Sequence, residues 1–115
     1  MTIKLRFDRH PEFPGSEVWT EDQSLAPVAG FLDSELRSVG DAREFAQRLK
    51  DVVAGKTPHF QGVGNGYFFA IFPTESEVGL DIGDDPETVS VPTAELIAAI
   101  EEWAAHLEAL AKSQR

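Results

Sequence analysis

The chain has 115 residues, no cysteine, and 20 acidic against 10 basic side chains, for a formal net charge of −10. A chain of this length builds one hydrophobic core, so we expect a single domain over residues 1–115. The missing cysteines exclude disulfides, thiolate metal sites and cysteine nucleophiles, and the negative charge argues against nucleic-acid binding.

The negative charge is concentrated in the second half of the chain. Residues 1–56 carry 10 acidic and 8 basic side chains, whereas residues 57–115 carry 10 acidic and 2 basic ones. No lysine or arginine occurs from residue 57 to residue 111, so this half has a potential of one sign. Two interpretations stay open. The surface either keeps the protein soluble or steers a basic partner towards it.

The amino terminus is charged where a secretion signal needs an apolar stretch. Lys4, Arg6, Asp8 and Arg9 interrupt it. The longest apolar run, residues 67–73, is much shorter than the roughly 20 residues of a membrane-spanning helix. We therefore expect a cytoplasmic protein that does not bind membranes.

Two strands are predicted at the start of the chain. Apolar side chains occupy every second position from residue 2 to residue 7, which is the period of a half-buried strand. A second short strand is predicted over 16–19, after a segment broken by proline and glycine. Residues 26–32 fit either a strand or a helix, and the strand is our prediction.

The first helix is predicted from a capping pattern. Asp41 and Glu44 have the spacing of a capping box. In this motif the Asp41 carboxylate accepts a hydrogen bond from the backbone amide of Glu44, and the Glu44 carboxylate accepts one from the backbone amide of Asp41. Gly55 is placed to end the helix in a left-handed conformation. Between them runs one apolar stripe, formed by Ala42, Phe45, Ala46, Leu49, Val52 and Val53.

The second half of the chain predicts a four-stranded meander. Asn65-Gly66 is a strong hairpin signal, because both residues tolerate positive φ. The run over 67–72 is apolar at every position, which predicts an inner strand covered on both faces or covered by a partner. The predicted strands cover residues 59–63, 67–72, 77–82 and 88–91.

A closing helix is predicted from Thr93, whose side chain can cap it. Residues 112–115 are predicted to be a frayed tail. The apolar stripe of this helix consists of Leu96, Ile100, Trp103, Leu107 and Leu110. Together the elements predict an α+β fold, in which an antiparallel meander of about four strands and the N-terminal strands pack with two helices.

No pattern in the sequence predicts catalysis or a cofactor. The glycine-rich stretch 62–66 precedes a strand, whereas a phosphate-binding loop precedes a helix. His10, His59 and His106 lie on separate predicted elements without the spacing of a triad or a metal motif. Paired carboxylates for acid–base work stay open, because nothing singles out a pair. We expect a protein that is not an enzyme and needs no cofactor.

Four carboxylates lie close together near the end of the third meander strand. Oxygen ligands of this kind suit a hard cation, but their spacing differs from that of a calcium-binding EF-hand loop. We therefore predict no metal site and interpret the cluster as an exposed acidic turn that suits a basic surface. Its members are Asp81, Asp84, Asp85 and Glu87.

Three stretches of the second half resemble a known class of proteins. They are the hairpin GNGYFFAI at 64–71, the acidic turn DDPETVSVP at 84–92 and the helix ELIAAIEEW at 95–103. Together they resemble small bacterial immunity proteins of contact-dependent growth inhibition and related polymorphic toxin systems. The order of elements is also similar to that of the uncharacterised YacL-type family.

The first resemblance implies a cytoplasmic inhibitor. Such a protein binds its cognate toxin domain, often a nuclease, and occludes the active site or the substrate groove. An acidic surface fits this role, because a nuclease must be basic where it grips phosphate. The alternative is a small acidic housekeeping domain or subunit without a toxin partner.

The partner-binding surface is predicted from strand alternation. Glu75, Glu77 and Asp81 share one face of a strand whose other face, with Val78, is apolar. Tyr67, beside the hairpin turn, is predicted to be an exposed aromatic anchor. The alternative is that the carboxylates only protect a sheet edge from aggregation. The complete predicted set is Glu75, Glu77, Asp81, Asp84, Asp85, Glu87 and Tyr67.

Overall fold

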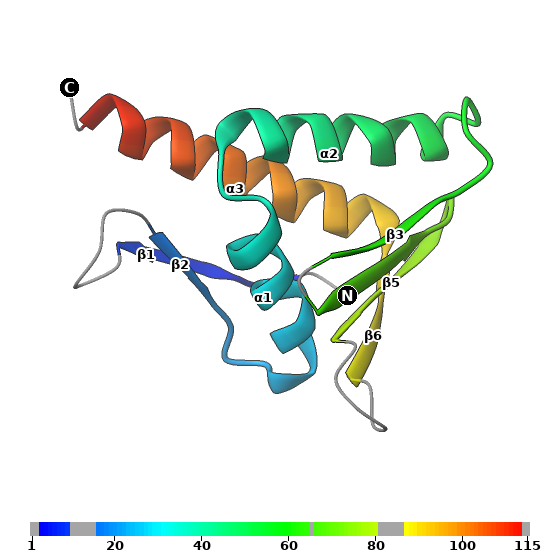
Figure 1. The fold of residues 1–115 in the computed structure, drawn as a ribbon, viewed down its shortest axis with the longest axis horizontal. Helices are drawn as coiled ribbons and strands as arrows, with labels where there is room; N and C mark the ends of the chain where they lie inside the picture. The colour runs from blue at the N-terminus through cyan, green and yellow to red at the C-terminus, as the bar shows by residue number, and fades with distance from the viewer. Residues whose placement is uncertain (1–2, 10–15, 65, 81–86, 114–115) are drawn as a thin grey trace.

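A short helix lies between the N-terminal hairpin and a larger sheet, and two longer helices pack side by side next to it (Figure 1). The computed structural model describes residues 3–9, 16–64, 66–80 and 87–113. The elements in chain order are β1 (Arg6–Arg9), β2 (Ser16–Trp19), η1 (Gln23–Leu25), α1 (Ala26–Glu35), α2 (Val39–Val53), β3 (Phe60–Gly64), β4 (Tyr67–Ile71), β5 (Glu75–Leu80), β6 (Glu87–Pro92) and α3 (Thr93–Ser113).

The larger sheet is the predicted meander. Its four strands are antiparallel and follow the order β3-β4-β5-β6, while β1 and β2 form a separate antiparallel hairpin. The helices and this hairpin all lie on one side of the four-stranded sheet (Figure 1). α1 packs on β5, β6 and β2, and α2 packs along α3. The predicted α+β fold is therefore confirmed.

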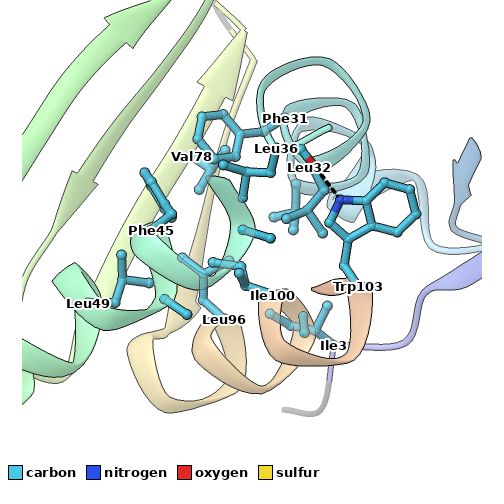
Figure 2. Packing of buried hydrophobic residues seen from close by; sticks show 14 of the residues in the cluster. Ile3, Phe31, Leu32, Leu36, Phe45, Leu49, Val78, Leu96, Ile100 and Trp103 are labelled. Carbon is cyan, nitrogen blue, oxygen red and sulfur yellow. Dashed lines mark hydrogen bonds between the residues drawn. The ribbon is translucent and has the colours of Figure 1, made fainter. Parts of the chain in front are cut away.

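The hydrophobic core lies between the sheet and the helices (Figure 2). Leu32 from α1, Leu49 from α2 and Ile100 from α3 are fully buried there. Trp103 is only 1% exposed, and its indole N–H donates a hydrogen bond of 2.5 Å to the carbonyl of Leu36, at the end of α1. The aromatic side chain thus fills the core and satisfies a helix terminus.

The strand predicted over residues 26–32 is wrong, because the segment forms the helix α1. Pro27 stands in the first turn, where a helix tolerates proline. Val28, Ala29, Phe31 and Leu32 are all buried, so the helix shows no polar face to solvent along this stretch. A helical segment whose residues are apolar on every side lacks the amphipathic period that distinguishes it from a buried strand.

The N-cap of α2 lies three residues before the predicted one. This N-cap is Ser38, whose hydroxyl accepts a hydrogen bond of 3.1 Å from the backbone N–H of Asp41, so Asp41 lies in the first turn and not at the cap. Gly55 follows the helix with φ +80°, as predicted. The predicted stripe is buried except for Val53, which is 49% exposed.

The remaining boundaries differ from prediction at the strand and helix ends. β1 begins at Arg6 and not at residue 2, although Ile3 is buried as the alternation predicted. α3 continues through Ser113, so Lys112 is helical and lies 3.8 Å from Glu108 in an ion pair. Among the helices that the structure describes, none has the length and apolar character to cross a membrane.

Candidate functional site

The four-stranded sheet has one covered and one uncovered face. On the inner face, Ile71, Val78 and Val91 are buried against the helices. The outer face is formed by the alternate residues, and no described element lies over it (Figure 1). We define the outer face as Gln61, Val63, Phe68, Ala70, Phe72, Glu75, Glu77, Gly79, Thr88 and Ser90.

The β3–β4 half of the outer face is apolar except for Gln61. Val63 is 76% exposed and Phe72 is 44% exposed, while Phe68 and Ala70 are half-buried between neighbouring strands. Val63 and Phe68 are direct cross-strand neighbours, and Phe68 lies opposite Gly79 on the next strand. Exposed apolar side chains on adjoining strands are typical of a surface that a partner covers.

The β5 half of the outer face is acidic. Glu75 and Glu77 are both exposed, as predicted, and Glu77 lies between Ala70 and Ser90 in the register. In the described part of the chain, neither carboxylate has a lysine or arginine within ion-pair distance. The acidic half is therefore uncompensated and adjoins the apolar half.

The other predicted carboxylates belong to the segment between β5 and β6. Asp81, Asp84 and Asp85 lie outside the described residues. Glu87 begins β6 opposite Leu80, and its side chain is also outside the described part. Their contribution to partner binding stays a prediction.

The predicted exposure of Tyr67 is wrong. Its side chain is on the inner face and is half-buried, with its ring centroid 6.3 Å from that of Phe31. The hydroxyl lies so close to Gly30 of α1 that a Cβ there would overlap it. The aromatic side chain that is exposed in this region is that of Phe72, directly after β4. Alternation was the available signal, but it could not assign the faces of a strand that is apolar at every position.

A buried polar junction holds the β4–β5 end of the outer face. The hydroxyl of Thr93 donates to the carbonyl of Phe72 at 2.6 Å, and Thr93 and Ser76 hydroxyls lie 2.6 Å apart. Because the Thr93 proton is used, Ser76 is the donor in the second bond. Thr93 starts α3 as predicted, but its hydroxyl bonds to the sheet. The junction fixes the turn between Phe72 and Glu75.

Several carboxylates along α2 and α3 are paired with cations, unlike those of the outer face. Glu108 of α3 accepts from Arg43 of α2 at 2.6 Å, and Lys50 lies 3.3 Å from Glu101. Arg48 lies 3.4 Å from Glu44 within α2. These side chains are about half exposed, so each pair adds little stability, but it cancels local charge. The residual negative field is therefore strongest away from the α2–α3 seam.

The chemistry available on the outer face is that of recognition. It offers carboxylates for cationic groups and apolar side chains that lose solvent on contact. In the part of the chain that the structure covers, no three His, Asp or Glu side chains are placed to hold a metal ion. For Asp81 to Glu87, which lie mostly outside that part, the expected absence of metal stays a prediction.

Comparisons with models of known protein families, with curated proteins and with solved structures found no match to this chain. The resemblance to immunity proteins therefore rests on the hairpin, turn and helix of the second half alone.

Proposed function

We propose that this protein is an immunity protein that binds a basic toxin domain, in keeping with the resemblance of its second half. The outer face docks on the toxin and blocks its active site or substrate groove. One observation carries the proposal: exposed apolar and uncompensated acidic side chains adjoin on an uncovered sheet face. That combination suits a partner whose own surface is basic.

The pairing of charges favours the outer face over α3 as the docking surface. Glu101 and Glu108 already have cationic neighbours, so a basic partner has to compete with those ion pairs. Glu75 and Glu77 gain a cation without losing one. Phe72, which follows the register partner of Ser76 and so lies near Glu75, and Val63 farther along the same face supply the apolar contact that holds a complex together after encounter.

The direct test is co-expression with a toxin domain encoded beside this gene. Growth should be rescued, and the purified proteins should form a stable complex. Association should slow as salt rises, because steering by the acidic face is screened over a Debye length of about 10 Å at 0.1 M salt. If the neighbouring toxin domain is neither bound nor inhibited, the proposal is wrong and a housekeeping role is favoured.

Charge reversal on two surfaces locates the interface. The variant Glu75→Lys with Glu77→Lys should fold, slow association about tenfold or more and lose protection. The matched control, Glu21→Lys with Glu102→Lys, changes the net charge equally at exposed positions elsewhere. Equal slowing in both variants would mean that net charge alone steers the partner and that the outer face is not the interface.

A third variant tests the apolar half of the outer face. Phe72→Ala should leave association almost unchanged and speed dissociation, because an exposed aromatic side chain that becomes buried in a complex acts after encounter. An unchanged dissociation rate would remove Phe72 from the interface.

A further inference from the structure

A second feature is a cavity at the opposite edge of β4 from the acidic strand. It has a volume of about 350 Å³, is open to the surface, and lies where the end of α1, the first half of α2 and the β3–β4 hairpin meet. Its lining residues are Phe31, Glu35, Leu36, Asp41, Glu44, Phe45, Arg48, Phe60, Val63 and Phe69.

Aromatic rings form the apolar wall of this cavity. Phe69 of β4 is the central ring of this wall. Its ring centroid lies 4.9 Å from that of Phe60 and 5.0 Å from that of Phe45. Phe31 and Phe45 extend from the two helices into the packed interior (Figure 2). Gly62 makes room for this arrangement, since a Cβ there would come within 2.9 Å of the Phe69 ring. The wall is therefore fixed by packing on several sides.

Three carboxylates and one cation accompany these rings. Arg48 lies 3.4 Å from Glu44 and holds its guanidinium 5.4 Å from the centroid of Phe60. The structure thus already contains one guanidinium on an aromatic face at the cavity. Glu35 and Asp41 have no lysine or arginine within ion-pair distance among the residues described. The lining keeps a surplus of negative charge.

Glu35 supplies the decisive observation. Its Oε1 atom is shut off from solvent and has no hydrogen-bond partner within the described chain. A buried carboxylate oxygen without a donor is costly, and such atoms in folded proteins are almost always paired. Glu35 is also the last residue of α1, where the helix dipole is negative and a cation is favoured. Glu35 as a whole is half-buried at the cavity, so a rotation of its side chain would bring this oxygen to a cationic donor there.

We propose that this cavity binds one organic cation, a guanidinium or ammonium group on a short alkyl stem. The group would donate to Glu35 and Asp41, and its alkyl stem would lie against the half-buried rings of Phe60 and Phe69, whose faces also attract the charged head. A volume of about 350 Å³ is near the small end of ligand sites, so it suits a single amine or basic side chain. This inference stands whether or not the outer face binds a toxin.

The test uses matched probes on the full-length protein. Butylguanidinium should shift the backbone amide NMR signals of α1, α2 and β3 and raise the melting temperature, because only the native state holds the site. Butylurea has nearly the same shape without the charge and should do neither at equal ionic strength. If the two probes act alike, or if butylguanidinium shifts no signal around the cavity, the proposal is wrong.

Substitution of Glu35 tests the named donor partner. Glu35→Gln keeps the side-chain shape and should weaken butylguanidinium binding at least about tenfold, since a hydrogen bond to a charged group is lost. It should also leave the unliganded protein folded, because Glu35 is only half-buried and its Oε1 atom makes no hydrogen bond within the described chain. Glu102→Gln on α3 is the control. Unchanged affinity in Glu35→Gln would overturn the assignment.

Two further probes distinguish the source of the cation. Spermidine stands for free amines, and a capped Gly-Arg-Gly peptide, compared with its citrulline counterpart, stands for a side chain of a partner protein. Tighter binding of spermidine supports a small-molecule ligand, and tighter binding of the arginine peptide supports a protein. Failure of both charged probes to exceed the citrulline peptide contradicts the proposal.

Discussion

The two faces of the four-stranded sheet differ in how their polar and apolar groups are satisfied. On the inner face, apolar side chains are covered by helices, and the hydroxyls of Thr93 and Ser76 are paired. On the outer face, Val63 and Phe72 stay exposed, and Glu75 and Glu77 have no described lysine or arginine within ion-pair distance. The side chains of the inner face make their contacts within the folded chain. The exposed side chains of the outer face remain available for contact with another molecule.

The largest effect is expected on the covered side. Trp103→Ala should lower the free energy of unfolding by about 3–5 kcal/mol, because it removes a buried aromatic side chain and leaves a cavity. Trp103→Phe keeps most of the volume but leaves the Leu36 carbonyl without its donor, which costs about 1–3 kcal/mol. Urea denaturation measures both. A Trp103→Phe variant as stable as the parent would contradict this role.

The same substitution on the two faces gives the sharpest comparison. Val78 is 1% exposed and Val63 is 76% exposed, and both are on the meander. Val78→Ala should cost about 2 kcal/mol, from the lost burial and the space left behind. Val63→Ala should change stability by less than about 0.5 kcal/mol. Similar losses in both variants would mean that the outer face is covered within the native protein.

The polar junction is expected to show an intermediate effect. Thr93→Val preserves the shape of the side chain but leaves the Phe72 carbonyl and the Ser76 hydroxyl without their hydrogen-bond partner. It should lower the free energy of unfolding by about 1–3 kcal/mol. Ser76→Ala should cost less, because Thr93 can still donate to Phe72. Thermal and urea unfolding of both variants check this order. The reverse order would contradict the assigned direction of the hydrogen bonds.

The smallest effect concerns a carboxylate that is already satisfied. Hydrogen bonds from the hydroxyl and the backbone N–H of Ser24 lower the pKa of Asp22 below its ordinary 3.8. A lowered pKa stabilises the native state above the unfolded-state pKa, and this contribution is lost as pH falls through the native-state value. Ser24→Ala should raise the pKa of Asp22 by NMR titration. An unchanged pKa would show that the hydroxyl is not its main cause.

The meander could be predicted from sequence because its signals are local. Asn65-Gly66 and the proline after Phe72 mark two turns, and the apolar run between them fits an inner strand. The helical conformation of residues 26–32 could not be predicted, because every residue of this stretch is apolar. Its conformation therefore depends on the elements that pack against it. Ser38 was missed as the N-cap because Asp41 offers a competing cap pattern three residues later.

The candidate sites were only partly accessible to the same reasoning. Glu75 and Glu77 could be placed on an exposed face because the apolar Val78 and Leu80 have the opposite parity in β5 and so fix its alternation. Tyr67 could not be assigned to a face, because its strand is apolar throughout. The cavity around Glu35 was beyond prediction, since its lining comes from two helices and two strands that meet only in the folded protein.

The position of β3 at the end of the sheet order has a consequence for how the protein behaves in concentrated solution. β3 pairs only with β4, and its sequence FQGVG has no charged side chain to discourage another strand from adding to its free edge. Mutual repulsion between chains of net charge −10 then provides the main protection. That repulsion vanishes near the isoelectric point of about 4.6. Acidification should therefore drive edge-to-edge association of folded molecules before it unfolds them.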